Sequence, residues 1–558
     1  MEENLENSCC NLSLDVSNIK AVISKLRTDL SLTEWLKVKD ILCGLEPILS
    51  KTVACAEQIS QVAHNFDSLP NSLGNGYRSH ITLCYVYVCF LSTVLNYIQR
   101  RRHVSSRHLQ KLHDCVLAIK CMNEILAFFQ TQCQISAKSG LLFDSGQNIA
   151  KLEELLESQS LDCFYGSCFC VQYPTSLQPL LRILACTAAV YCNETGRGKA
   201  PSLMRLLWKS LPAYRNAIKR KKLLAEHLSH EKLDSIKDFW HLAETIPNIR
   251  CLTGDKMPRL KVNKRYRIPH SGIYFRKNSE NLRPDKDVTI RLIMFRDYRK
   301  RPSSNLLFHC HGGGFIAQTS KSHLVYLRLW AKELDIPIVS LDYSLSPESS
   351  FPIAQEEVVT AYLWCLNNPS LIGWTGERIC LAGDSAGANL IVTLLLRLLS
   401  ISIDITPIPT SLVLFYGAFN LNLSLSPSRF FFLLDPLLPL PVITTCLRAY
   451  VEKSTALEDS DNPELYLKSP FLSPIYADSQ QLAQFPPTSI LVSNLDPLLD
   501  DSVAFAKVLA DSGVTVFFHT VANLPHGFLN LSHLNSECYK ASLKAIKLIR
   551  AGLEATNN

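Results

Sequence analysis

The sequence lacks the signals that mark several large classes of protein. Its acidic start, Met1-Glu2-Glu3-Asn4, has neither the basic nor the apolar region of a signal peptide. Its 20 cysteines are scattered, and the pairs Cys163/Cys168 and Cys168/Cys170 have no second Cys/His pair at zinc spacing nearby. We therefore expect reduced, buried thiols in a cytosolic protein that has no structural metal site.

Charged residues are also scarce, at 19% against 47% hydrophobic residues, which excludes a disordered chain. The formal net charge of +7 is modest for 558 residues and arises partly from two basic clusters, Arg100–Arg102 and Lys219–Lys222. Neither a nucleic-acid motif nor a basic stripe with interleaved aromatic residues accompanies them, so we expect no nucleic-acid partner. Solvated helix ends or an anionic lipid surface fit these clusters better.

One long hydrophobic run is present, from Ile81 to Ile98. Its length approaches that of a membrane-spanning helix, but it contains four polar residues. These are Thr82, Ser92, Thr93 and Asn96. We expect a buried core helix, with a membrane-spanning helix as the alternative.

The chain changes its pattern near residue 265, and at this length two domains are expected. Before that point the periodicity predicts helices at 42–63, 81–99, 108–130, 177–191 and 203–222. After it, helices alternate with strands predicted at 288–295, 305–309, 336–341, 379–382, 412–416, 490–495 and 515–519. We therefore expect an all-α domain over 1–265 and an α/β domain over 266–558, with a mostly parallel sheet and helices on both faces.

The most informative motif is Gly383-Asp384-Ser385-Ala386-Gly387. An apolar segment precedes it and a helix-forming run follows it, which predicts a strand, a tight turn and a helix. Such a turn forces the serine into a strained conformation and lifts its hydroxyl clear of the sheet. Ser385 is therefore the predicted nucleophile.

A glycine run, His311-Gly312-Gly313-Gly314, begins 74 residues before Ser385 and follows a predicted strand. A loop of this kind exposes backbone N–H groups, each of which contributes about 3 kcal/mol when it stabilises the oxyanion of acyl transfer. We assign the amides of Gly312, Gly313 and Ala386 to such a hole. A plain glycine hinge is the alternative.

Two further segments supply the acid and the base that a serine nucleophile needs. Asp496 ends a predicted strand and precedes a proline, and His526 follows the last predicted strand in the sequence Pro-His-Gly-Phe. Both lie where parallel strands gather functional groups. Asp500 or Asp501 is the alternative orienting acid.

In this order, His-Gly-Gly-Gly, Gly-Asp-Ser-Ala-Gly, Asp-Pro-Leu and His-Gly-Phe resemble the hormone-sensitive lipase family of α/β-hydrolases. The stretch 342–348 looks like the family's supporting loop, with Ser346 where alanine is usual. Segments 75–79, 163–166, 193–196, 317–320 and 435–440 are also similar, so the resemblance covers nearly the whole chain. It implies supporting roles for His311, Gly314, Asp384, Asp342 and Glu348.

The resemblance departs in one interval. Vertebrate members carry a long serine-rich regulatory insert before the strand that bears the acid, whereas here only a short polar stretch, Glu452–Lys468, lies there. Phosphorylation of that insert is therefore not implied. The stretch around 420–480, which includes Phe430–Leu434, is expected to form a cap that receives an acyl chain or contacts lipid, with a helix packed on the core as the alternative.

The resemblance implies a serine ester hydrolase that releases fatty acids from neutral lipids, namely acylglycerols and cholesteryl esters, without a metal or organic cofactor. It also implies a cytosolic protein that binds lipid droplets or membranes peripherally, and a homodimer. A soluble carboxylesterase or deacetylase would share all these catalytic groups. A non-catalytic receptor of the same fold is the alternative from another class.

Overall fold

The computed structural model describes residues 2–70, 72–143, 161–195, 203–228, 233–245, 258–269, 287–401, 407–422, 424–451 and 466–554. The chain forms two compact units. The helical unit comprises Met1–His230, Ser424–Pro439 and Asn494–Asp500. The sheet unit comprises Glu231–Leu423, Leu440–Ser493 and Asp501–Asn558.

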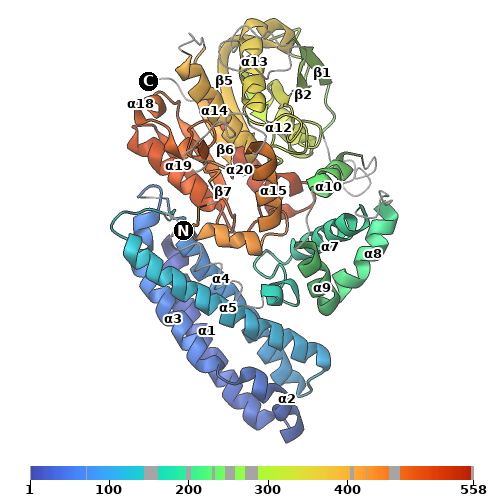
Figure 1. The fold of residues 1–558 in the computed structure, drawn as a ribbon, viewed down its shortest axis with the longest axis vertical. Helices are drawn as coiled ribbons and strands as arrows, with labels where there is room; N and C mark the ends of the chain where they lie inside the picture. Colours follow the sequence, from blue (N-terminus) through green and yellow to red (C-terminus); the bar gives the residue numbers. More distant parts are fainter. Residues whose placement is uncertain are drawn as a thin grey trace. The chain divides into compact units, whose positions relative to one another are not determined.

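In the helical unit, four long helices pack side by side (Figure 1). They are α1 (Glu2–Asp29), α3 (Leu45–Val62), α4 (Gly76–Arg101) and α5 (Ser106–Ser136). The shorter elements are α2 (Leu32–Leu42), η1 (Ala63–Phe66), η2 (Leu161–Tyr165), α7 (Gln178–Thr195), α8 (Leu203–Arg215) and α9 (Ala217–Leu228). The helices predicted at 42–63, 81–99, 108–130 and 177–191 are confirmed.

The helix predicted over 203–222 is wrong, because the chain forms two helices there. Pro212 lies in the last turns of α8 and removes a backbone donor. The side-chain oxygen of Asn216 then accepts hydrogen bonds from the amides of Ile218 and Lys219 at 2.9 and 3.2 Å. This capping begins α9 as a new helix.

Among the described residues, α4 is the one helix long and apolar enough to cross a membrane, and half of its most apolar window is buried. It packs against α1, α3 and α5. Asn75 caps its first turn by accepting from the amide of Arg78 at 3.1 Å, and the Asn75 amide group donates to Ala63 O. These contacts favour the predicted core helix.

The sheet unit is built on eight strands in the order β1-β2-β4-β3-β5-β6-β7-β8, in which β2 runs antiparallel to both of its neighbours and the remaining pairs are parallel. The strands are β1 (Val262–Ile268), β2 (Val288–Met294), β3 (Ser303–Cys310), β4 (Ile338–Asp342), β5 (Trp374–Asp384), β6 (Ser411–Phe415), β7 (Thr488–Ser493) and β8 (Val516–Val521). All seven predicted strands are present.

Helices cover this sheet in two separate layers, one formed by α12 with α20 and the other by α13 with α14. Every residue of β6 and β7 is buried, as expected for strands covered on both faces. The larger helices are α10 (Leu233–Thr245), α12 (Leu324–Leu334), α13 (Ile353–Asn367), α14 (Ala386–Ser400), α15 (Leu440–Val451), α19 (Leu499–Asp511) and α20 (Ser536–Glu554). The short ones are η4 (Pro369–Ile372), η5 (Ser428–Leu433), η6 (Pro474–Tyr476), α18 (Ser479–Leu482) and η7 (Phe528–Leu531).

The boundary predicted at 265/266 is wrong, because it falls inside β1. This strand pairs with β2 from Val262↔Met294 to Ile268↔Val288, and α10 also belongs to the sheet unit. The sequence of β1, Val-Asn-Lys-Arg-Tyr-Arg-Ile, reads as a polar linker because an edge strand turns most of its side chains to solvent.

The cap expected around 420–480 is also corrected. Ser424–Pro439 belongs to the helical unit, where η5 packs on α4 and buries Phe430, Phe431 and Phe432. Their side chains are core residues, so the packed alternative is confirmed for them. Residues 452–465 lie outside the described part of the chain.

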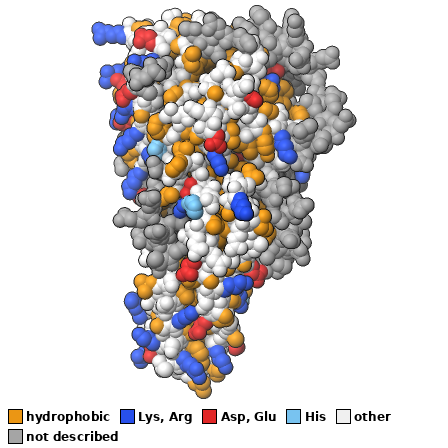
Figure 2. All heavy atoms as spheres, turned by 90° about the vertical axis from the view of Figure 1, so that its left-hand side faces the viewer, with side chains coloured by type: hydrophobic (Ala, Val, Ile, Leu, Met, Phe, Trp, Pro, Cys, Tyr) orange, Lys and Arg blue, Asp and Glu red, His pale blue; other side chains and the backbone are white. Residues whose placement is uncertain are grey.

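Basic side chains lie in small groups on the face of the molecule seen in Figure 2, separated by hydrophobic and acidic ones. The cluster Lys219–Lys222 is only partly solvated, because Arg220 is buried and donates to Gly166 O at 2.6 Å. One member of this predicted basic cluster is therefore a structural residue that holds α9 to the turn after η2.

Candidate active site

Ser385 lies between β5 and α14 in a conformation that side chains rarely adopt, with φ 54° and ψ −121°. The two flanking glycines make room for it. A Cβ atom on Gly383 would lie 2.4 Å from Gly387 O, and one on Gly387 would lie 2.2 Å from Cys310 O. The strained serine turn predicted from the sequence is therefore present.

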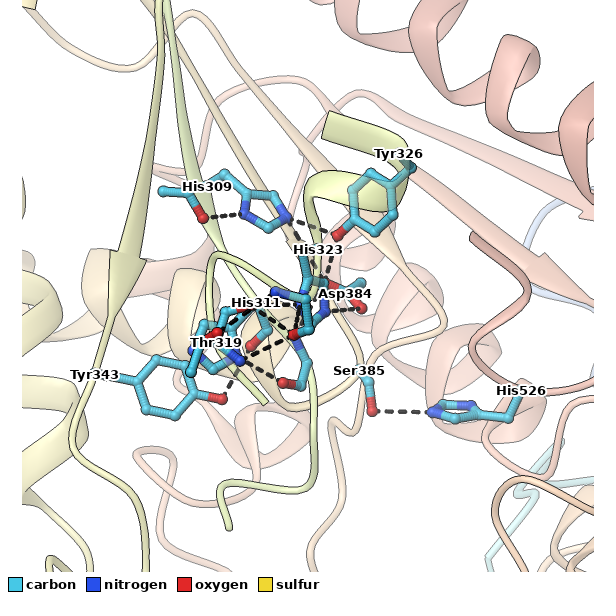
Figure 3. A network of polar contacts seen from close by, with 12 residues as sticks. His309, His311, Thr319, His323, Tyr326, Tyr343, Asp384, Ser385 and His526 are labelled. Carbon is cyan, nitrogen blue, oxygen red and sulfur yellow. Dashed lines mark hydrogen bonds and ion pairs between the residues drawn. The ribbon is translucent and has the colours of Figure 1, made fainter. Parts of the chain in front are cut away.

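His526 lies beside this serine, as Figure 3 shows. Its Nε2 atom is 2.9 Å from Ser385 Oγ, although 141 residues separate the two in the chain. The imidazole is only 6% exposed, and the ring of Tyr416 packs edge-on against it at 5.0 Å. This is the contact that a general base makes with a serine nucleophile.

Asp496 lies three residues after the end of β7 and is buried. Its Oδ1 accepts from the amide of Leu498 at 2.8 Å, which closes a tight turn. Its role as the orienting acid stays a prediction. The two alternative acids have other partners: Asp500 accepts from the amides of Gly76 and Ser428, and Asp501 accepts from the amide of Asn420.

The assignment of Gly312 to the oxyanion hole is corrected. Its amide donates to Asp384 Oδ1 at 3.0 Å, and an amide has one hydrogen to give. Gly313, at φ 116°, and Ala386, the first residue of α14, stay the predicted donors. Among the described residues, neither of these two amides donates a hydrogen bond to another backbone group.

Asp384 is the centre of a buried polar network behind the nucleophile (Figure 3). Besides the Gly312 amide, it accepts from the Tyr326 hydroxyl at 2.9 Å, and His323 Nε2 lies 3.4 Å from its Oδ2. His309 bridges the Tyr326 hydroxyl and the Ser340 hydroxyl, each at 2.9 Å. The predicted supporting role of Asp384 is thus seen as a set of contacts that hold the glycine loop.

Electrostatics favour a charged Asp384. Burial opposes ionisation, but His323 and His309 outweigh it and hold the pKa of this carboxyl well below its usual range. Burial also lowers the pKa of His309. Sequence reasoning missed Tyr326 and His323, because no motif links them to the serine turn 60 residues away.

His311 stacks on Tyr343 at 4.3 Å between ring centroids, and the Tyr343 hydroxyl donates to His311 O at 2.9 Å. Burial and the neighbouring His323 lower the pKa of His311 to about 4, so it is neutral at pH 7. Gly314 lies against α15, where an added Cβ would come within 2.5 Å of Cys446 Sγ. Both residues therefore shape the glycine loop.

The structure places the two predicted supporting carboxylates, Asp342 and Glu348, in different surroundings. Asp342 accepts from the Ser320 amide at 2.6 Å and helps to fix the segment after the glycine loop. Glu348 has a side chain that is 64% exposed and pairs with Lys237 at 2.8 Å, so its supporting role is not seen. Glu357, which the sequence did not single out, is buried and accepts from both the amide and the hydroxyl of Ser344 at 2.5 Å.

Cys310 and Cys380, considered as thiols near the site, are fully buried. Burial raises the pKa of both thiols, that of Cys380 to about 12. Neither is therefore a reactive thiolate at neutral pH. Cys163, Cys168 and Cys170 are free and buried, as predicted.

Two family models match the chain. The model described as the hormone-sensitive lipase N-terminus matches residues 11–292, slightly more than half of the chain, and the alpha/beta hydrolase fold model matches 307–530. The second range begins in β3 and ends just after His526. The two matches together cover both units.

Similar proteins include the hormone-sensitive lipases of Mus musculus and Homo sapiens, each 27% identical over 92% of this chain. The alignments cover 93% of the mouse protein and 66% of the human one. Because the mouse alignment spans 731 residues, the mouse protein contains segments that this 558-residue chain lacks. The carboxylic ester hydrolase LipN of Mycobacterium tuberculosis is 32% identical over 45% of this chain and 66% of its own length.

A solved structure of similar fold is an esterase of Pyrobaculum calidifontis, at 25% identity and a TM-score of 0.49, which matches 60% of this chain and 99% of that one.

Proposed function

This chain belongs to the hormone-sensitive lipase family of α/β-hydrolases, and we propose that it is a serine ester hydrolase that releases fatty acids from neutral lipids, in particular acylglycerols and cholesteryl esters. The observation that carries the chemistry is the 2.9 Å contact between His526 Nε2 and Ser385 Oγ on a strained turn. The choice of lipid rests on the names of the relatives.

The chemistry follows from this geometry. His526 Nε2 takes the hydroxyl proton while Ser385 Oγ attacks the ester carbonyl, and the amides of Gly313 and Ala386 stabilise the oxyanion. The C–O bond then breaks, and the alcohol leaves with the proton from Nε2. Water, deprotonated by the same nitrogen, releases the fatty acid from Ser385.

A soluble carboxylesterase would use the same groups, and only its preference for short, dissolved esters would distinguish it. A receptor of this fold has no need for a histidine within hydrogen-bonding distance of a strained serine. The contact between Ser385 and His526 therefore favours an enzyme.

We also propose that the protein binds lipid surfaces peripherally, and that α8 makes the contact. Met204 and Trp208, which are 76% and 77% exposed, lie with Leu207 on one side of this helix, while Leu206 and Ser210 face inward. Residues 203–228 contain seven Lys or Arg and a single Glu. Arg220 is buried, and Arg205 and Lys209 pair with Glu194, so the remaining cations are Arg215, Lys219, Lys221 and Lys222. Exposed aromatic and apolar residues flanked by cations suit a surface with anionic phospholipid. A homodimer stays a prediction.

The test of the proposed function is fatty-acid release by the full chain from emulsified diacylglycerol and from a dissolved short-chain ester, with Ser385→Ala beside it. We expect turnover of both substrates and its loss in the variant. Turnover confined to the short ester would assign a carboxylesterase instead. Turnover that survives in Ser385→Ala would refute the nucleophile.

A further inference from the structure

The turn that carries the predicted acid is tied into the helical unit by a second carboxylate. Asp500 lies in the first turn of α19, four residues after Asp496, and is fully buried. Its Oδ1 accepts from the amide of Gly76 at 2.8 Å, and its Oδ2 accepts from the amide of Ser428 at 2.7 Å. Gly76 is the first residue of α4, where unpaired amides and the helix dipole favour a negative charge.

Ser428 contacts both ends of this turn. Its hydroxyl donates to Pro497 O at 3.1 Å and accepts from the amide of Asp500 at 3.0 Å. Asp496 closes the turn from the other side, because its own oxygens accept from the amides of Leu498 and Leu499. Hydrogen bonds therefore hold every residue of the turn from Asp496 to Asp500, and the side chains of Leu498 and Leu499 take no part in them.

The partners of this turn are themselves rigid. The residue before Ser428, Pro427, accepts at its carbonyl from Nε2 of the buried His80 on α4 at 2.8 Å. The His80 ring packs on Phe430 and Phe431 at 5.4 and 4.8 Å. A Cβ atom on Gly76 would lie 2.3 Å from Ser428 N, so the three segments meet without spare room.

From this arrangement we infer that Asp500 is a positioning residue, through which α4 and η5 of the helical unit fix the turn that bears Asp496. The inference rests on the proposed function and on the predicted role of Asp496. An orienting acid contributes to catalysis through the tautomer and direction of its histidine, so a small displacement of the turn affects turnover more than substrate binding.

The test uses the full chain and a dissolved short-chain ester. Asp500→Asn keeps the size of the side chain but turns an NH₂ group toward one of two amide donors. We expect kcat to fall roughly 10- to 100-fold with KM within about twofold, since complete loss of an orienting acid costs about 10⁴-fold. We also expect the acidic limb of the kcat/KM profile to move to lower pH, because a displaced carboxylate no longer raises the pKa of the histidine.

A double-mutant cycle separates positioning from general loosening. If Asp500 acts through Asp496, Asp500→Asn lowers kcat no further in an Asp496→Asn background. Independent, multiplicative losses would overturn the inference, as would an unchanged kcat in folded Asp500→Asn. If Asp500→Asn does not fold, Ser428→Ala replaces it as the test variant. This substitution removes the hydroxyl contacts to Pro497 O and to the Asp500 amide, and we expect the same loss of kcat.

The matched control is Thr52→Val, which removes a buried hydrogen bond to Asn123 between α3 and α5 of the same unit. It should lower stability without changing kcat or the pH profile, and an equal loss of kcat in this control would refute positioning by Asp500. The results that would refute positioning by Asp500 differ from the result that would refute the proposed function. That function fails only if the native chain shows no turnover sensitive to Ser385→Ala.

Discussion

The carboxylate of Asp384 illustrates how a single buried charge organises this site. It receives hydrogen bonds from the amide of Gly312 and the hydroxyl of Tyr326, and it lies beside two histidines. A buried charge is tolerated only when such donors replace water. Because one of the donors belongs to the glycine loop, the charge also fixes that loop next to Ser385.

Removal of one donor tests this account. Tyr326→Phe leaves the Asp384 charge with one partner fewer, so the free energy of unfolding should fall by about 1–3 kcal/mol. Tyr362→Phe is the matched control, because its buried hydroxyl has no hydrogen-bond partner among the described residues, and its loss should cost nothing. Urea unfolding of both variants measures the difference, and equal stabilities would contradict the proposed network.

The helix α4 carries a buried polar side chain, His80, near its N-terminal end. This imidazole is fully buried, and its Nδ1 has no hydrogen-bond partner within the described ranges. Its environment consists of Phe129, Phe430, Phe431 and the carbonyl of Pro427. Burial lowers the pKa of His80 to about 4, although the Pro427 carbonyl acts in the opposite direction.

This shift predicts how α4 responds to acid. The pKa of His80 is lower in the folded chain than the usual 6.5, so its contribution to stability is complete above pH 6.5 and is lost as the pH falls toward 4. The loss amounts to about 3 kcal/mol. Thermal unfolding between pH 7 and 4 should therefore show a shallower decline in Tm for His80→Gln than for the native chain. Substitution of the exposed His64 to Gln should leave the slope unchanged.

For the whole molecule, the proposed lipid contact predicts that a substitution on α8 weakens binding to lipid vesicles without changing the hydrolysis of a dissolved ester. Burying a side chain as large as Trp208 contributes about 1.5–3 kcal/mol, so Trp208→Ser should weaken binding to vesicles of phosphatidylcholine and phosphatidylserine roughly tenfold or more. Turnover of a dissolved ester should not change. Leu371→Ser, at an exposed apolar position of the sheet unit, is the control for vesicle sedimentation.

Binding to these vesicles should also weaken as salt is raised, since the cations of α8 and α9 contribute through screened attraction. If Trp208→Ser sediments with vesicles as well as the native chain does, α8 is not the contact. If the native chain binds purely zwitterionic vesicles as well as anionic ones, the cations do not contribute, while contact through Trp208 would still stand.

Local chemistry explains why so much of the site was predictable. The turn around Ser385, the strands and the contact with His526 follow from short motifs and periodicity, because a strained serine between glycines and an apolar run have few other uses. Other features depend on pairings between distant segments. The Gly312 amide bonds to Asp384 rather than to an oxyanion, Asp500 binds the first turn of α4, and the phenylalanines of η5 pack in the helical unit. Each of these joins residues 72 to 424 positions apart. The packing of whole elements decides which distant groups meet, and no local sequence pattern encodes that packing.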